Sequence, residues 1–258
     1  MNHIWQPGEA SALAARLQQP QDAAALEVRG LRKTFGLRTV LEGVDFDVRP
    51  GELVVVLGAN GSGKSTLLRC VAGLIEPTAG SISVRGRGET AMIFQQIHLV
   101  GRRSALDNVC CGALARLPLR RSVSPLVFPQ ELRREGMACL ARVGLADRAA
   151  ERARRLSGGQ QQRVAIARAL CQRANVILAD EPVAALDPSA SEQVMRLLGT
   201  LAHDEGLAVA AVLHQPDLAR RHADRVVGLL RGRVEWDRPA AEMQTAEVDA
   251  LYADERST

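Results

Sequence analysis

Residues 53–66 read LVVVLGANGSGKST, an apolar run followed by a glycine-rich segment. The apolar run Leu53–Leu57 is rich in β-branched residues and follows a Pro-Gly turn, which predicts a central strand buried on both faces. The segment Gly58–Gly63 begins the pattern G-x-x-x-x-G-K-[ST], and a helix is predicted over Lys64–Gly73. A strand, such a loop and a helix in this order predict a phosphate-binding loop.

Phosphate chemistry explains the residue types in this loop. Glycines let backbone N–H groups surround phosphate oxygens, and the helix N-terminus adds its dipole. We expect Lys64 to reach the β- and γ-phosphates of a nucleotide and the Ser65 hydroxyl to ligate Mg²⁺. The residues expected to contact the nucleotide here are Gly58, Asn60, Gly61, Ser62, Gly63, Lys64, Ser65 and Thr66.

A second buried strand, predicted over Val176–Ala179, ends in the carboxylates Asp180 and Glu181. A strand parallel to Leu53–Leu57 would place Asp180 beside the phosphate loop, where it can hold Mg²⁺ through water. Glu181 could then polarise an attacking water. Alone, such a pair could equally be a solvated strand end. Together with the phosphate loop it predicts nucleotide hydrolysis.

A third motif, LSGGQ at Leu156–Gln160, precedes a helix predicted over Gln160–Leu170. Its glycines and helix N-terminus form a second anion-binding surface, which would be redundant on the same nucleotide within one subunit. The simplest use is on a nucleotide held by another copy of the chain. LSGGQ between a phosphate loop and an Asp-Glu strand resembles the ATP-binding subunits of ABC transporters, and the resemblance covers about Leu26–Trp236.

The resemblance implies a fold class and a domain organisation. The fold class is α/β, a P-loop NTPase (RecA-like) core with an N-terminal antiparallel β subdomain and an inserted α-helical subdomain. The implied domains are an N-terminal extension at 1–25, an ATP-binding core at 26–100 and 157–238, a helical subdomain at 101–156 and a C-terminal helical tail at 239–258. It also implies a homodimer that binds ATP and Mg²⁺ in two composite sites.

Three further residues acquire roles from the resemblance. Phe35 stands where the family has an aromatic residue that stacks on adenine, although a core phenylalanine is the alternative. Gln95 matches a glutamine that reaches Mg²⁺ and the attacking water, with Gln96 beside it as a second candidate. His214 matches a histidine that contacts the γ-phosphate. The implied catalytic residues are therefore Lys64, Gln95, Glu181 and His214, and the implied metal ligands are Ser65, Gln95 and Asp180.

The LSGGQ motif and Asp187 are implied to act across the dimer interface. Ser157, Gly158, Gly159 and Gln160 would contact the nucleotide of the facing subunit. Asp187, in the sequence Ala-Leu-Asp after the Asp-Glu strand, would cross the interface. Its alternative is a cap for the helix predicted over Ser189–His203.

A finer resemblance points to the phosphonate-import ATPase group. It is carried by MIFQQIHL (92–99), ALDNVCCGALARLP (105–118), LADEPVAALDP (178–188) and LHQPDLARRHADR (213–225). It implies organic phosphonate as cargo, with phosphite close behind. The implied partners are integral membrane permease subunits and, indirectly, a periplasmic or extracellular phosphonate-binding protein. The implied location is the cytoplasmic face of the inner membrane, bound peripherally.

Two other functions remain open at this point. One is an ABC ATPase for another cargo, such as phosphate, an amino acid or a lipoprotein for release or export. The other is a nucleic-acid-associated ABC ATPase, which the insert of about 55 residues disfavours because it is too short for coiled-coil arms and has no metal-spaced cysteines.

Composition agrees with an α/β ATPase and excludes several classes. The 258 residues are 47% apolar and carry a net charge of +4, which is too mild to argue for nucleic acid. No stretch approaches the ~18 apolar residues of a membrane span, and the first residues do not form a secretory signal. The five cysteines contain no CxxC pair and predict reduced thiols. Only Lys33 and Lys64 are lysines.

Residues 101–155 contain twelve arginines and five acidic residues, a local net charge of +7. These arginines either form a solvated helical face or lie near anionic lipid headgroups or acidic elements of the membrane subunits, as Arg102 and Arg103 could. Outside this insert, turns at Gly30, Gly36 and Gly43 predict short separate strands near the N-terminus. Ala10–Leu17 predicts a short helix.

Overall fold

The computed structural model describes residues 23–85, 90–118 and 128–253. The helix predicted over Ala10–Leu17 lies outside these residues. The strands are β1 (Leu26–Phe35), β2 (Arg38–Val48), β3 (Leu53–Leu57), β4 (Ala79–Val84), β5 (Thr90–Ile93), β6 (Val176–Asp180), β7 (Ala208–Val212), β8 (Arg225–Leu230) and β9 (Arg233–Pro239). The α-helices are α2 (Lys64–Val71), α3 (Ala105–Cys110), α5 (Gln130–Arg142), α6 (Gly158–Leu170), α7 (Pro188–His203), α8 (Pro216–His222) and α9 (Thr245–Leu251).

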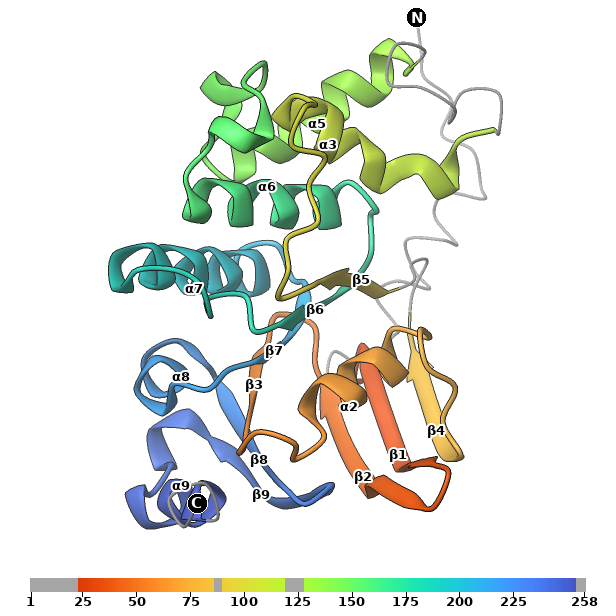
Figure 1. Ribbon diagram of the computed structural model, residues 1–258, viewed down its shortest axis with the longest axis vertical. Helices are drawn as coiled ribbons and strands as arrows, with labels where there is room; N and C mark the ends of the chain where they lie inside the picture. The colour runs from red at the N-terminus through yellow and green to blue at the C-terminus, as the bar shows by residue number, and fades with distance from the viewer. Residues whose placement is uncertain (1–22, 86–89, 119–127, 254–258) are drawn as a thin grey trace, which may run out of the picture.

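A six-stranded sheet runs through the molecule in the order β5-β6-β7-β3-β8-β9 (Figure 1). Its first five strands are parallel, and β9 pairs antiparallel with β8. In β3, Leu53, Val55 and Leu57 belong to the hydrophobic core on one face. Val54 and Val56 belong to the core on the other face. The predicted burial of this strand on both faces is therefore confirmed.

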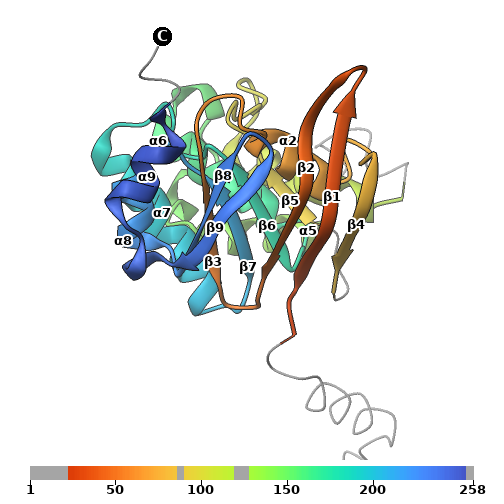
Figure 2. The ribbon, with the colours of Figure 1, turned by 90° about the horizontal axis from the view of Figure 1, so that it is seen from below.

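The N-terminal strands form a separate antiparallel sheet of three strands, β2-β1-β4. This sheet stands to one side of the six-stranded sheet, and α2 lies between them (Figures 1 and 2). Leu67 and Leu68 of α2 share a core with Phe46 of β2 and Val56 of β3. The helix that follows the phosphate loop is thereby fixed by apolar packing on both sides.

Strands β1 and β2 are longer than the sequence predicted. Turns were expected at Gly30 and Gly43, and this prediction was wrong. Both glycines have positive φ, 55° and 77°, and the β1–β2 pairing shifts register between Val28 and Leu31 and again after Leu31. Glycine at positive φ accommodates an extra residue as a bulge, so each strand continues past it. Gly36 does lie in the turn between the two strands.

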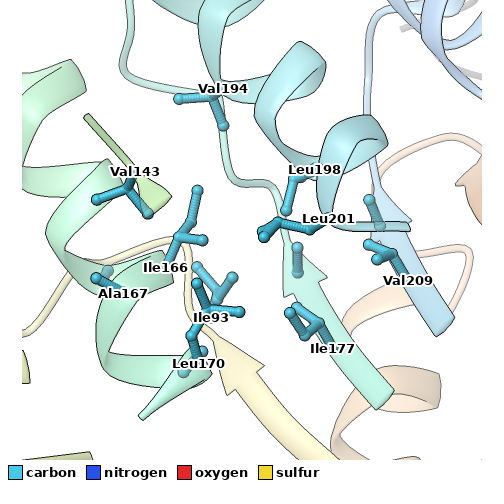
Figure 3. Close-up of a cluster of buried hydrophobic side chains, with 14 of the residues drawn as sticks. Ile93, Val143, Ile166, Ala167, Leu170, Ile177, Val194, Leu198, Leu201 and Val209 are labelled. Atoms are coloured by element: carbon cyan, nitrogen blue, oxygen red, sulfur yellow. The ribbon is translucent and has the colours of Figure 1, made fainter. Parts of the chain in front are cut away.

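Helices α6 and α7 cover one face of the six-stranded sheet (Figure 3). Ile166 of α6 and Leu198 of α7 lie in one buried cluster with Ile93 of β5 and Ile177 of β6. Helices α3 and α5 pack on the side of α6 that faces away from the sheet (Figure 1). Helix α6 therefore contacts both the sheet and the helices of the arginine-rich part of the chain.

The described helices are short. Within residues 23–85, 90–118 and 128–253, none has the length and apolar character needed to cross a bilayer, and the longest, α7, has 16 residues.

Candidate functional site

The loop between β3 and α2 is enclosed by its neighbours. A Cβ atom on Gly58 would lie 2.2 Å from the carbonyl oxygen of Leu229 in β8. Gly63 has a φ of 108°, and a Cβ there would lie 3.0 Å from a carbonyl oxygen of β2. Gly232 N, in the turn between β8 and β9, donates to Ser62 O at 2.9 Å. Close approach of other backbone segments is thus what requires glycine at positions 58 and 63.

Replacing Gly58 with Ala is expected to destabilise the protein by about 3 kcal/mol and to weaken ATP binding at least about tenfold, because the new methyl group would overlap a backbone oxygen. Gly61→Ala is the matched control in the same loop. Gly61 has a φ of 75° but open space around it, so this variant carries only backbone strain of about 1 kcal/mol. Thermal unfolding measures the stability of both variants, nucleotide titration measures binding by Gly58→Ala, and equal losses of stability in the two variants would contradict the contact with β8.

Two polar side chains of the loop are buried. Lys64 is 5% exposed, and its Nζ donates to Gly58 O at 2.7 Å and to Ala59 O at 2.9 Å. Ser62 Oγ is buried without a hydrogen-bond partner in the described part of the chain. Leaving a hydroxyl unsatisfied costs about 1–3 kcal/mol, which a phosphate oxygen would relieve. An ammonium, an unsatisfied hydroxyl and a helix N-terminus together fit a phosphate group.

Ser65 and Asp180 are joined across the site. Ser65 Oγ donates to Asp180 Oδ1 at 2.9 Å. Asp180 is 3% exposed, and burial raises the pKa of its carboxyl group, so a cation here would offset the cost of the charge. A hydroxyl and a carboxylate are oxygen ligands that suit Mg²⁺. Residues 23–85, 90–118 and 128–253 contain no group of three His, Cys, Asp or Glu side chains placed for a metal.

Both carboxylate oxygens of Glu181 are engaged. Gln95 Nε2 donates to Oε2 at 2.8 Å, and His214 Nε2 donates to Oε1 at 2.5 Å. These residues follow β5, β6 and β7, which are adjacent parallel strands, so the topology brings them to one edge of the sheet. Of the two candidate glutamines, Gln95 is the one that contacts Glu181. A carboxylate held from two sides is fixed in direction, as a general base requires.

The backbone of Glu181 is also unusual. Its φ is 49°, in the left-handed region that costs a residue with a side chain about 1–2 kcal/mol. Such strain is often found at functional sites, where it aims a side chain. Here it turns the chain directly after Asp180, so the two neighbouring carboxylates have different partners, Ser65 for one and the Gln95–His214 pair for the other.

Phe35 lies at the end of β1 and is 48% exposed. The alternative that it is a simple core residue is therefore wrong. Lys33 Nζ lies 4.7 Å from the ring centroid and donates to Glu76 O at 2.7 Å. An exposed ring supported by a cation can still stack on a flat, electron-poor partner such as a base.

The LSGGQ motif forms the N-terminus of α6. Ser157 Oγ accepts from Gln160 N at 3.3 Å, while Gln160 Oε1 accepts from Ser157 N at 2.9 Å. This reciprocal capping box starts the helix at Gly158, two residues earlier than predicted. The remaining N–H groups of the first turn are left for other acceptors.

Asp187 lies beside that motif. Its Oδ1 accepts from Ala190 N at 2.9 Å and caps α7, so the predicted alternative of a helix cap is confirmed. A Cβ on Gly159 would lie 3.0 Å from Ala190 Cβ, so glycine lets the two helix starts pack closely. Ser157, Gly159 and Asp187 line one cavity of about 210 Å³. The role of Asp187 across a dimer interface stays a prediction.

The predicted residues thus form two clusters. The first cluster, at the carboxyl edge of the sheet, comprises the phosphate loop Gly58–Thr66 with Gln95, Asp180, Glu181 and His214. The second cluster, at the start of α6 and α7, comprises Ser157–Gln160 and Asp187. Phe35 is placed on the antiparallel sheet.

The support given to the loop by the β8–β9 hairpin was not predicted. The contact between the hairpin and the loop joins positions about 170 residues apart. No local pattern relates Leu229 or Gly232 to the phosphate loop. The contact between the two segments becomes visible only in the folded structure, where they pack closely together.

Known proteins give an independent comparison. Residues 41–184 match the family model described as ABC transporter. The chain is 48% identical over 241 residues to the phosphonates import ATP-binding protein PhnC of Nocardia farcinica, covering 88% of this chain and 90% of that protein. Its fold is similar to the dimeric structure of MJ0796, a bacterial ABC transporter cassette, with a TM-score of 0.71, 32% identity and coverage of 84% of this chain and 100% of that chain. A post-hydrolysis state of MJ0796 bound to ADP and Pi gives a TM-score of 0.69 at 32% identity, with the same coverage.

Proposed function

Because this chain belongs to the ABC transporter family, we propose that it is the ATP-hydrolysing subunit of an importer that takes up phosphonates through separate membrane subunits. The family and the fold class predicted from the sequence are confirmed. The protein is an ATPase that converts ATP and water to ADP and phosphate. The cargo rests on the similarity to the phosphonate importer of Nocardia farcinica, which also disfavours the other cargoes and the nucleic-acid alternative.

The observation that carries hydrolysis is the placement of Glu181 between Gln95 and His214, next to the phosphate loop. In the proposed mechanism the loop amides, Lys64 and Ser62 hold the phosphates of ATP. Glu181 accepts the proton of the attacking water, and Gln95 and His214 keep its carboxylate aimed at that water. The water oxygen bonds to the γ-phosphorus, the bond from that phosphorus to the bridging oxygen of ADP breaks, and the proton held by Glu181 then passes to the phosphate or to solvent.

We propose that Mg²⁺ is held by Ser65 and Asp180, with Gln95 reaching it from the neighbouring strand. When bound, the ion would neutralise charge that develops on the phosphate oxygens. Two of its proposed ligands already contact each other, and the buried carboxyl group of Asp180 favours a cation beside it.

We propose that the second cluster serves the ATP of a second copy of the chain. The solved cassette that is similar to this chain is dimeric. Ser157, Gly159 and Gln160 at the helix start line a cavity, and a helix N-terminus can accept a phosphate from outside its own subunit. In this proposal Ser157–Gln160 contact the phosphates across the interface, Asp187 crosses beside them, and Phe35 stacks on adenine. Two ATP molecules then join two copies.

The proposed assembly includes permease subunits in the inner membrane and, through them, a phosphonate-binding protein outside the cytoplasm. The ATPase would lie peripherally on the cytoplasmic face. The proposed domains are the core at 26–100 and 157–238, the helical subdomain at 101–156 and the helical tail at 239–258. Arg102 and Arg103 are exposed at the start of the helical subdomain, where they could meet anionic headgroups or acidic elements of the permease.

Growth on single phosphorus sources tests the function. A strain that lacks this chain and has no second importer should fail to grow on a phosphonate but should grow on orthophosphate. The wild-type gene should restore growth, and Lys64→Ala should not, because the variant lacks the ammonium that holds the β- and γ-phosphates.

The same experiment separates the cargo from the ATPase. Failure on phosphite alone would keep the importer and change the cargo. Normal growth of the deletion strain on every phosphorus source would contradict the proposed cargo. Rescue by Lys64→Ala would instead contradict the need for ATP hydrolysis in transport.

A further inference from the structure

Lys33, the lysine outside the phosphate loop, holds its ammonium group between two partners. Its Nζ lies 4.7 Å from the centroid of the Phe35 ring and donates to Glu76 O at 2.7 Å. The residue is half-buried. A lysine on a surface strand normally extends its strongly hydrated ammonium group into water. Here the ammonium group lies between a ring and a backbone carbonyl, so its position requires a separate account.

The carbonyl that binds Lys33 belongs to residues 76–78, a segment between α2 and β4. The same segment makes two more hydrogen bonds with the end of β1. Thr78 N donates to Arg32 O at 2.8 Å, and Thr34 N donates to Thr78 Oγ1 at 3.0 Å. The residues on both sides of Lys33 are therefore bonded to this segment. Because α2 begins at the phosphate loop, the end of β1 is joined through a short stretch of chain to the helix that follows that loop.

The Phe35 ring is held on one side and open on the other. The ammonium group of Lys33 lies over one face of the ring, while the residue as a whole is 48% exposed. Leu37, two residues further on, is fully exposed, so the turn beside the ring is not covered by other described residues. A free side chain loses rotational freedom when a ligand stacks on it. A ring that already has a fixed contact loses less, and the ligand binds more tightly.

We propose that Lys33 is a positioning residue, which holds the Phe35 ring in place for the base of ATP and fixes the ring relative to the phosphate loop. This inference rests on the proposed function, in which Phe35 stacks on adenine. Lys33 acts through the ring and through the carbonyl of Glu76, and it is given no contact with a phosphate. An interaction that is the same before and during hydrolysis raises affinity and leaves the chemical step unchanged. Lys33 should therefore affect KM and not kcat.

Titration of the full chain with two ligands tests this proposal. One is ATP, and the other is ribose 5-triphosphate, which has the same sugar and phosphates but no base. Lys33→Met keeps an unbranched apolar side chain and removes the charge and the donors. It should weaken ATP binding about three- to fivefold and raise KM by the same factor at unchanged kcat. Its affinity for ribose 5-triphosphate should equal that of the wild type, because this ligand has nothing to stack on the ring.

Three further variants separate positioning from a general effect of charge. Arg32→Met is the matched control, because it removes one positive charge from the adjacent position of β1, where the side chain pairs with Glu42 at 3.9 Å. It should bind ATP as the wild type does. Lys33→Arg keeps a cation for the ring and should stay within about twofold of the wild type. Phe35→Ala should weaken ATP binding about tenfold, and adding Lys33→Met to it should have no further effect, since no ring is left to hold.

Three results would overturn the proposal, and they differ in what they leave standing. Equal losses of ATP and ribose 5-triphosphate binding in Lys33→Met would show that the lysine acts on the phosphates. Unchanged ATP binding in Lys33→Met, in a protein that binds ATP more tightly than ribose 5-triphosphate, would reject the role of Lys33 and keep the proposed function. Equal wild-type affinities for the two ligands would reject the base contact of Phe35 together with the role of Lys33.

Discussion

Replacing Glu181 with Gln is expected to lower ATP turnover by at least about 100-fold, because a general base contributes about 10²- to 10⁴-fold to such reactions. The amide has nearly the same shape, and it can still accept from Gln95, but it cannot accept the proton of the attacking water. ATP binding should persist, since the phosphate loop is unchanged. The variant should therefore accumulate as an ATP-bound dimer.

Phosphate release and light scattering after size-exclusion chromatography measure these two effects. Glu131→Gln is the matched control, because Glu131 is an exposed carboxylate on α5 outside both clusters. It should keep wild-type turnover and the wild-type response to ATP. Turnover of Glu181→Gln within about tenfold of the wild type would remove Glu181 from the role of general base.

Mixing two inactive variants is expected to restore activity if each ATP site is shared between two chains. Lys64→Ala disables the first cluster. Ser157→Glu disables the second cluster, because its carboxylate would repel a phosphate, while a negative charge is tolerated at a helix N-terminus. Each variant alone should lose at least about 100-fold in turnover. A mixed dimer, however, would have one intact site, formed by the loop of one chain and the motif of the other.

Random exchange makes about half of the dimers mixed, so the mixture should recover up to about a quarter of the wild-type rate. Cross-linked mixed dimers of defined composition are the control for incomplete exchange. If these remain as inactive as the two parents although ATP still binds to them, the motif does not act across the interface. Unfolding temperatures of both variants near that of the wild type would exclude simple misfolding.

The central part of the fold could be predicted because its signals are local. An apolar β-branched run, a glycine-rich loop and a helix are adjacent in sequence, and the structure places them as expected. The N-terminal strands were predicted less well, because Gly30 and Gly43 give the same signal whether they form a turn or a bulge. Whether each glycine forms a turn or a bulge is decided by the pairing of β1 with β2 and β4, and this pairing is not local in sequence.

The first cluster could likewise be predicted only where its signals are local in sequence. That Asp180 and Glu181 end a buried strand is visible in the sequence. Gln95 and His214 each contact one carboxylate oxygen of Glu181. This arrangement depends on the strand order, which brings together three segments that span about 120 residues of the sequence. The left-handed backbone of Glu181 has no sequence signal either, since glycine or asparagine would be the usual residue there.

This chain has only two lysines, so reagents that modify lysine side chains can react at two positions alone. One of them is buried in the phosphate loop, and the other lies over the ring of Phe35. Acetylation or an amine-reactive dye thus has no other lysine to modify, and each acetyl group removes a charge beside the proposed nucleotide. Attachment of the protein to a solid support through a lysine would hold it at a residue beside the proposed nucleotide site. If bound ATP protects Lys33 from acetylation, the extent of this protection would report how much of the protein has nucleotide bound.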